Sequence, residues 1–156
     1  MQYHLSIISR DRIELILNGS KTIFYWFQSK RYAPYRSVKT GDIIYIQATE
    51  NTGGKVRGKF TASKVETCDN LTPATIDYIF ATYGQQMFGT LFSDSDFVNE
   101  DLNKRRDSKY ATLIHITKPC RFPNPQTRPF DKPGPRTTWM VLNQCQVQTM
   151  RELEGC

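Results

Sequence analysis

The feature that most constrains the fold is a corner where an amphipathic segment stops at a glycine and continues as an aromatic run. Asp11 and Glu14, three residues apart, resemble a capping pair at a helix N-terminus, and Gly19 is the residue type that favours a left-handed helix stop. The pattern therefore predicts a helix over residues 11–18. It also places one ammonium group, that of Lys21, where this helix gives way to the next element.

The residues that follow the glycine favour a pleated strand. The run from Thr22 to Phe27 is β-branched and aromatic, a composition that is enriched in strands. Alternation along a strand sends Phe24 and Trp26 to one face, and Tyr25 and Phe27 to the other. An ammonium beside several aromatic faces suits a nucleobase or a nucleotide. The plainer alternative is that these rings fill the core, as strand aromatics usually do.

The length of the chain fits one domain. At 156 residues it can bury enough surface for an independent core. We expect a single domain over residues 1–148 and a C-terminal tail over residues 149–156. No apolar run approaches the roughly 20 residues of a membrane span, and the N-terminus lacks the layout of a secretion signal. These patterns predict a cytoplasmic protein with no membrane partner.

The residues that usually bind metals are few and scattered. The histidines, His4 and His115, each lie in a β-rich stretch, which favours structural roles over catalytic ones. No Cys-x-x-Cys pair occurs, so we expect neither a zinc site nor a disulfide framework. No cofactor or metal site is predicted, and the cysteines are expected to be reduced thiols: Cys68, Cys120, Cys145 and Cys156.

Charge is distributed in three blocks along the chain. Residues 21–64 and 104–136 each contain nine Lys or Arg and two acids, whereas residues 65–103 contain seven acids and no Lys or Arg. If the basic blocks meet in space, the molecule has a positive face that attracts phosphates. The alternative is that the opposite signs pair with each other or merely solvate the surface.

Periodicity and turn residues predict the remaining elements, which together resemble a meander of strands with flanking helices. The segment 52–55 is expected to be a hairpin turn. A helix should open at Pro73 and stop at Gly84. The other expected elements are strands at 3–8, 43–47, 56–65, 110–117 and 138–142, the last with an extension through Val147, and a helix at 94–102 that turns Phe97, Val98 and Leu102 inward.

The segment from Pro119 to Arg136 holds six of the eight prolines and four basic residues. Proline removes a backbone donor, so this segment is predicted not to pair in a sheet and to lie on the surface as a stiff loop. It either clamps a strand of nucleic acid or only wraps the exterior of the folded strands.

Several short motifs, in their order and spacing, resemble the ASCH family over residues 3–142. That family has a PUA-like β-barrel with flanking helices, so the resemblance implies the α+β class. The motifs are His4-Leu5-Ser6-Ile7, the stretch Leu15-Ile16-Leu17-Asn18-Gly19-Ser20-Lys21-Thr22-Ile23, Arg31-Tyr32-Ala33-Pro34, Val38, Gly41-Asp42 and Trp139-Met140-Val141-Leu142.

The resemblance implies a cleft beside the helix-to-strand corner that binds nucleic acid and, in some members, acts on RNA or modified nucleosides. The common pattern there is Gly-x-Lys-x-x-Glu-x-Arg. Gly19 and Lys21 match it, whereas Phe24 and Trp26 replace the carboxylate and the guanidinium. Members that remove an acyl group from acetylated cytidine use a lysine and a threonine three residues on, and that threonine position is again Phe24.

The sequence therefore predicts a protein that binds RNA or single-stranded or modified DNA, with a base in a cleft beside Lys21. One alternative is a hydrolase of RNA or of a modified nucleoside, in which Lys21 is catalytic. Another is a protein-interaction module that uses the proline-rich loop or the acidic helix. The oligomeric state stays open. The residues expected to contact nucleic acid are Lys21, Thr22, Phe24, Tyr25, Trp26, Lys30, Arg31, Arg36, Lys104, Arg105 and Arg106.

Overall fold

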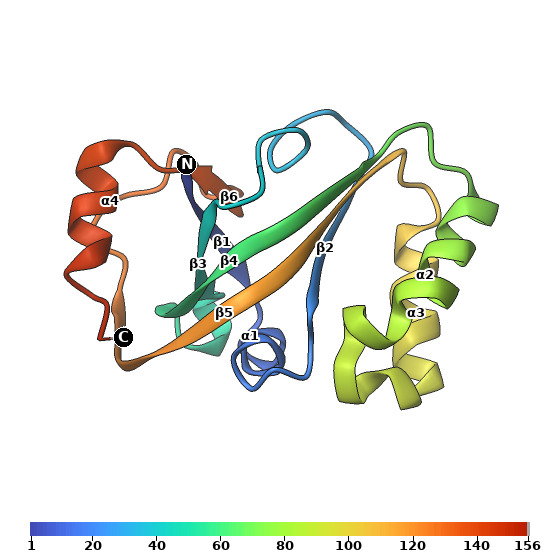
Figure 1. The fold of residues 1–156 in the computed structure, drawn as a ribbon, viewed down its shortest axis with the longest axis horizontal. Helices are drawn as coiled ribbons and strands as arrows, with labels where there is room; N and C mark the ends of the chain where they lie inside the picture. The colour runs from blue at the N-terminus through green and yellow to red at the C-terminus, as the bar shows by residue number, and fades with distance from the viewer. Residues whose placement is uncertain (156) are drawn as a thin grey trace.

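The computed structural model describes residues 1–155, which form one curled sheet with helices around it (Figure 1). The strands of this part of the chain are β1 (Tyr3–Ile8), β2 (Ile23–Gln28), β3 (Ile43–Ala48), β4 (Lys55–Cys68), β5 (Tyr110–Thr127) and β6 (Trp139–Val141). Its α-helices are α1 (Arg10–Leu17), α2 (Pro73–Phe88), α3 (Ser95–Arg105) and α4 (Gln144–Arg151), and its 3₁₀ helices are η1 (Glu50–Thr52) and η2 (Gly89–Ser93).

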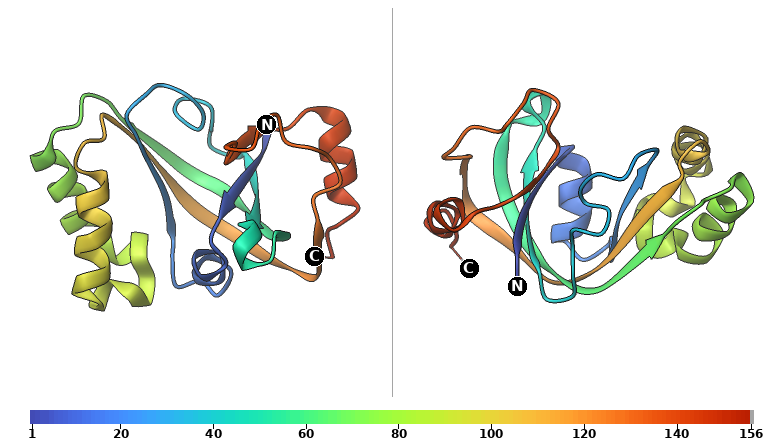
Figure 2. Two further views of the ribbon diagram at one scale, coloured as in Figure 1. Left: turned by 180° about the vertical axis from the view of Figure 1, so that it is seen from behind. Right: turned by 90° about the horizontal axis from the view of Figure 1, so that it is seen from above.

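The strand order across the sheet is β2-β5-β4-β3-β1-β6. Only β1 and β3 pair in parallel within the described residues, and every other neighbouring pair is antiparallel. The sheet curls around α1, while α2 and α3 lie beyond β2 and α4 lies at the opposite end (Figures 1 and 2). The expected α+β class is confirmed, in the form of an open half-barrel whose edge strands are β2 and β6.

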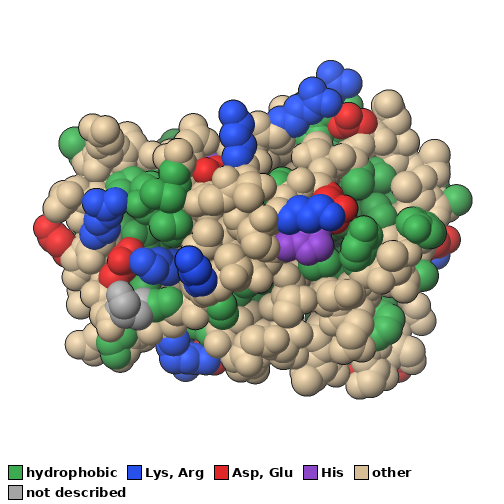
Figure 3. Space-filling model, viewed as in Figure 1, with side chains coloured by type: hydrophobic (Ala, Val, Ile, Leu, Met, Phe, Trp, Pro, Cys, Tyr) green, Lys and Arg blue, Asp and Glu red, His purple; other side chains and the backbone are tan. Residues whose placement is uncertain are grey.

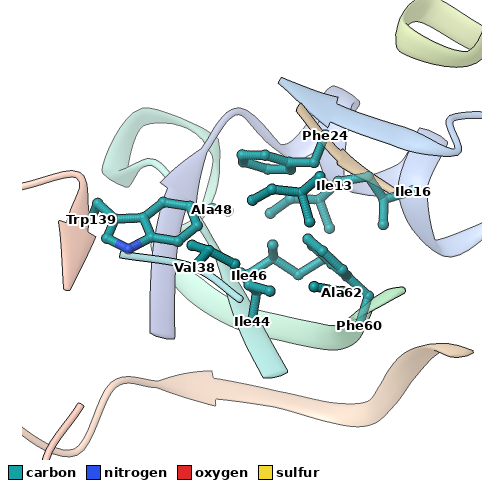
Figure 4. Close-up of a cluster of buried hydrophobic side chains, with 11 residues drawn as sticks. Ile13, Ile16, Phe24, Val38, Ile44, Ile46, Ala48, Phe60, Ala62 and Trp139 are labelled. Atoms are coloured by element: carbon teal, nitrogen blue, oxygen red, sulfur yellow. The ribbon is translucent and has the colours of Figure 1, made fainter. Parts of the chain in front are cut away.

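Three buried clusters hold these layers together. The first lies inside the curl and includes Ile13, Phe24, Phe60 and Trp139 (Figure 4). The second lies between β2, β5 and the helices α2 and α3, and the third lies under α4. Phe24 belongs to the first cluster and Tyr25 and Phe27 belong to the second, so the predicted phasing of β2 is confirmed.

The first helix begins one residue earlier than expected, and its capping differs. Ser9 precedes α1 without a capping bond from its side chain, and Asp11 lies in the first turn. The predicted capping pair is therefore wrong, since the Glu14 carboxylate instead meets the Arg121 guanidinium at 2.8 Å. The left-handed stop is confirmed, because Gly19 has a φ of 81°.

The second helix continues past the expected stop at Gly84. A Cβ on Gly84 would lie 2.2 Å from Cε1 of Phe92, so this glycine makes room for a ring instead of ending the helix. The chain turns at Gly89, whose φ is 57°. Here η2 contacts the corner before Lys21, because the Thr90 N–H donates to the Ser20 hydroxyl at 2.8 Å. The chain that leaves α2 therefore supports the position of Lys21.

We expect Gly89→Ala to destabilise the protein. A Cβ at residue 89 would lie 2.7 Å from the backbone carbon of Ser20, in a left-handed conformation that side chains rarely adopt. Overpacking and backbone strain together should lower the free energy of unfolding by about 2–4 kcal/mol, measured by urea denaturation. Gly134→Ala is the matched control, since the nearest atom to its Cβ would be Thr137 Oγ1 at 3.6 Å. Equal stability of the two variants would contradict this role for Gly89.

The proline-rich segment corrects the sequence prediction, because residues 119–127 continue β5 and pair with β4. Cys120 and Arg121 stand opposite Lys59 and Gly58, and Gln126 stands opposite Val56. Pro119, Pro123 and Pro125 fall where the register shifts, so they interrupt few ladder bonds. This half of β5 also lies beyond the strand that pairs with its other edge, and proline is tolerated on a free edge.

The last strand is shorter than expected and does not extend through Val147. Asn143 ends it by opening α4 with a capping box, in which its side chain accepts from Gln146 N–H and its own N–H donates to the Gln146 side chain. The helix α4 then crosses residue 148. Beyond the helix, the Glu154 carboxylate meets the Lys59 ammonium at 2.9 Å.

The cysteines agree with the sequence only in part. Cys68 and Cys145 are free, as expected. Cys120 is disulfide-bonded, so the prediction of a reduced thiol is wrong there. Scattered cysteines carry no spacing signal, and their pairing depends on which parts of the chain the tertiary structure brings together. The prediction for Cys156 lies outside the described residues. In residues 1–155, every helix is too short or too polar to span a bilayer.

Candidate functional site

A pocket opens along the free edge of β2, where the end of β1, the start of α1 and the end of α3 converge. It encloses about 410 Å³, within the range of small-molecule sites. Its wall combines an aromatic side from β2 with cationic side chains from three elements. The lining residues are Ile7, Ile8, Ser9, Arg12, Lys21, Phe24, Tyr25, Trp26, Phe27 and Arg105.

Lys21 is the most unusual member of this wall. It is only 4% exposed, and its Nζ lies 4.3 Å from the centroid of the Tyr25 ring and 5.7 Å from that of Phe24. Burial, followed by repulsion from the Arg12 guanidinium, lowers the pKa of Lys21 to about 7, and Asp101 opposes this only in part. The amine therefore exchanges its proton near neutral pH.

Asp101, from α3, organises the polar side of the pocket. Its Oδ1 accepts from Nη2 of Arg12 and from Nη2 of Arg105, each at 3.3 Å, and its Oδ2 accepts from the Tyr25 hydroxyl at 2.9 Å. Burial raises the pKa of the Tyr25 phenol, so this group stays a hydrogen-bond donor. One buried carboxylate thus fixes two guanidinium groups and one phenol around Lys21.

The aromatic side divides between core and pocket. The rings of Phe24 and Trp26 are stacked, with centroids 5.9 Å apart and planes 8° from parallel. Phe24 is 2% exposed and belongs to the inner core, whereas Trp26 is half-buried and lines the pocket. Phe24 therefore fills the core, and Trp26 provides the accessible aromatic face of the pocket.

The structure brings together five of the residues that the sequence singled out and leaves the others outside the pocket. Lys21, Phe24, Tyr25, Trp26 and Arg105 line one cavity. Thr22 is exposed, and its backbone N–H donates to the Gln86 carbonyl. The remaining predicted contacts lie elsewhere on the surface: Lys30, Arg31, Arg36, Lys104 and Arg106.

Two of these outlying arginines lie on the loop after β2, in a cluster with Tyr35 of the same loop and Tyr110 of β5. Nε of Arg31 donates to the Tyr110 hydroxyl at 2.9 Å, and the Tyr35 and Tyr110 rings are 4.9 Å apart. Arg36 is paired with Asp69 at 3.0 Å. Both arginines are exposed, so the cluster presents cations and aromatic faces to solvent.

Several residues of the two basic blocks form ion pairs with the acidic block, which argues against a single positive face. On the face drawn in Figure 3, Lys and Arg side chains are separated by neutral and apolar surface. Five ion pairs join the basic blocks to the acidic block, so only part of the basic charge converges. These pairs are Arg36–Asp69, Lys64–Glu66, Lys104–Glu100, Arg105–Asp101 and Arg106–Asp77.

Sequence reasoning missed Arg12 and Asp101. Arg12 lies on the helix before Lys21 and Asp101 lies 80 residues after it, and nothing in a helical period distinguishes a residue that faces a pocket from one that faces solvent. They supply a guanidinium and a carboxylate at the place where β2 carries Phe24 and Trp26 instead of Glu and Arg.

Metal-binding side chains do not gather in this part of the chain. Within residues 1–155, no three His, Cys, Asp or Glu side chains lie close enough to hold an ion together. The described lining residues of the pocket include no carboxylate, and both oxygens of Asp101 beside them already accept hydrogen bonds. The donor set therefore fits an anionic or aromatic ligand better than a cation.

Comparison with known proteins identifies the fold. No family model matches the chain, and neither does any curated protein. The structure is similar to the ASCH protein of Zymomonas mobilis, with a TM-score of 0.69 at 15% identity over 97% of this chain and 95% of that one. A point mutant of that protein gives 0.71 at 15% identity, over 97% and 96%. A protein from Pseudomonas putida gives 0.51 at 12% identity, over 97% and 98%. The chain therefore has the fold of these ASCH structures, an open half-barrel with flanking helices.

Proposed function

We propose that this protein binds RNA or single-stranded or modified DNA, with one nucleotide unit in the pocket beside Lys21. The observation that carries this proposal is the composition of the pocket wall, in which the Trp26 ring and the cationic groups of Arg12, Lys21 and Arg105 line one cavity. A base stacks on the indole, and the cations neutralise backbone charge. The half-enclosed shape suits a base that has left its stack.

The arginine–tyrosine cluster on the loop after β2 supports a longer path for the strand. Tyr110 stands opposite Gln28, one residue beyond the Phe27 wall of the pocket. The Arg31 guanidinium lies over the Tyr110 ring at 5.3 Å, and the Arg36 guanidinium lies over the Tyr35 ring at the same distance. Such surfaces stack bases without sequence preference and contact phosphates. Neighbouring nucleotides of a bound strand follow this cluster away from the pocket.

We expect Trp26→Ala to weaken binding of a short single-stranded oligonucleotide by about 5- to 150-fold, because base stacking on an aromatic side chain contributes about 1–3 kcal/mol. Fluorescence anisotropy with labelled RNA and DNA measures the change. Affinity should also fall steeply with added salt, since phosphate contacts release counterions. Tyr78→Ala is the matched control, because this aromatic is 65% exposed on α2 and outside the pocket. Equal losses in the two variants would place the nucleic acid elsewhere.

A second candidate function, hydrolysis of RNA or of a modified nucleoside, is favoured by the state of Lys21. A general base works best when its pKa lies near the working pH, and the pKa of this amine is about 7. Asp101 and Tyr25 provide the carboxylate and the hydroxyl that β2 lacks at the position of Phe24. Turnover of RNA or of N-acylcytidine that is abolished in Lys21→Ala would support this activity. A protein-interaction role has less support, because residues 119–127 of the proline-rich segment are part of the sheet.

A further inference from the structure

The polar half of the pocket has more cations than one carboxylate can neutralise. Arg12, Lys21 and Arg105 line it, and Asp101 is the acid that contacts both guanidinium groups. Both oxygens of Asp101 are already used, Oδ1 by the two arginines and Oδ2 by the Tyr25 hydroxyl. Lys21 therefore has no carboxylate of its own. It is more than nine-tenths buried, and its ammonium lies over the ring faces of Phe24 and Tyr25.

Hydrogen-bond donors in this half outnumber acceptors. A guanidinium carries five N–H donors, and each arginine donates to Asp101 through one nitrogen, Nη2. The ammonium of Lys21 adds up to three donors. About a third of each arginine side chain is exposed, 32% for Arg12 and 28% for Arg105, so part of each guanidinium can be reached, although Nε of Arg105 is buried. Because both Nη2 atoms contact the same oxygen, the two guanidinium groups lie close enough to share one ligand.

We propose that Arg12, Lys21 and Arg105 together hold the phosphate group of a nucleotide whose base lies against Trp26. This inference rests on the proposed function and identifies the ligand that the site takes. A phosphate offers several acceptor oxygens on one centre, which matches donors that converge from α1, α3 and the corner before β2. Asp101 positions the two guanidinium groups and leaves their other donors to the ligand. The start of α1, where Ser9 lines the pocket, adds the positive end of a helix.

Phosphate binding is coupled to proton uptake at Lys21. The groups that face this amine are Arg12 from α1, Asp101 and Arg105 from α3, and Tyr25 from β2. In the free pocket, burial and the two guanidinium groups favour the neutral amine. An anion beside it favours the ammonium, so binding raises its pKa and takes up a proton. Affinity for a phosphate therefore falls as pH rises above about 7, whereas affinity for an uncharged nucleoside does not.

The test is isothermal titration calorimetry on the full chain. The probes are the four nucleoside 5′-monophosphates, the matching nucleosides, inorganic phosphate, and oligonucleotides with and without a terminal phosphate. We expect a monophosphate to bind at least about tenfold more tightly than its nucleoside, and on the order of tenfold more tightly at about pH 6.5 than at about pH 8.5. Runs in two buffers of different ionisation enthalpy count the protons taken up. The oligonucleotide pair distinguishes a strand end from an internal phosphate.

Four variants make the test specific. Lys21→Met should lose the phosphate preference and the proton uptake, and Lys21→Arg should keep the preference but lose the pH dependence, because arginine stays charged. Arg12→Gln should weaken the binding of monophosphates more than the binding of nucleosides. Lys104→Gln is the control, since this exposed lysine lies beside Arg105 on α3, outside the pocket, and is paired with Glu100. Thermal unfolding confirms that each variant folds.

The outcomes separate the two proposals. If nucleosides bind as tightly as monophosphates, or if Lys21→Met keeps the phosphate preference, the phosphate site is wrong. If oligonucleotides still bind in a manner that depends on Trp26, the proposed function survives that result. Oligonucleotide binding that is unchanged in Trp26→Ala and in Lys21→Met would contradict both proposals. The absence of binding by every probe would also contradict both.

Discussion

Lys21→Met is expected to raise the free energy of unfolding by on the order of 3 kcal/mol at about pH 6, although it removes the central residue of the pocket. The charged form of a buried lysine loses its hydration, and Lys21 has no carboxylate of its own to compensate. Methionine has a similar shape and no charge. A gain in stability with a loss of binding is typical of a residue retained for function.

The gain should depend on pH in a defined direction. In the unfolded chain the pKa of Lys21 is about 10.5, and in the folded chain it is about 7. Between these values the unfolded state binds more protons, so wild-type stability rises with pH, by up to about 1.4 kcal/mol per unit. Lys21→Met lacks this rise, and the two proteins should converge near about pH 10. Urea unfolding across this range measures it, and a variant that is less stable than wild type at about pH 6 would contradict the assignment.

Asp42→Ala is expected to lower the free energy of unfolding by about 3–5 kcal/mol, because it leaves the buried His4 ring without its charged partner and two backbone N–H groups without their acceptor. Asp42 accepts from His4 Nε2, Gln2 N–H and Lys39 N–H, each at 2.9 Å. On its other side, His4 Nδ1 accepts from Trp139 Nε1 at 3.3 Å. This network joins β1, the turn before β3 and β6, which are the strands that close one end of the sheet.

The same network predicts loss of stability in acid. Burial lowers the pKa of His4, against the raising influence of Asp42. Burial disfavours the Asp42 carboxylate, but bonds from Gln2, His4 and Lys39 outweigh it and lower its pKa. Both groups bind fewer protons when folded, so wild-type stability falls as pH drops below about 6.5, and again below about 4. Asp42→Ala should flatten the lower part of this fall.

Asp11→Ala is the control for Asp42, since Asp11 is exposed in the first turn of α1. Chemical denaturation of the two variants at several pH values distinguishes a buried network from a general effect of lost acidic charge. Similar losses in both variants would mean that the His4–Asp42–Trp139 network does not stabilise the sheet.

Local signals in the sequence were sufficient for much of the fold. Apolar alternation placed β1 at Tyr3–Ile8, and the phasing of Phe24 against Tyr25 was confirmed because a strand repeats every two residues. The sequence predictions were wrong where a residue type can serve two different structural roles. Gly84 makes room for Phe92 instead of ending α2, and the prolines of 119–127 lie at register shifts instead of breaking β5.

The pocket shows the same division between local and tertiary information. The sequence by itself determined that a lysine and an aromatic strand meet at a glycine corner, because short-range backbone preferences decide where a helix stops and a strand starts. Only the tertiary structure decided the charge around that lysine, because Arg12 and Asp101 reach it from helices 9 and 80 residues away along the chain. The pKa of Lys21 depends on burial and on these distant charges, and both exist only once α1 and α3 have packed beside β2.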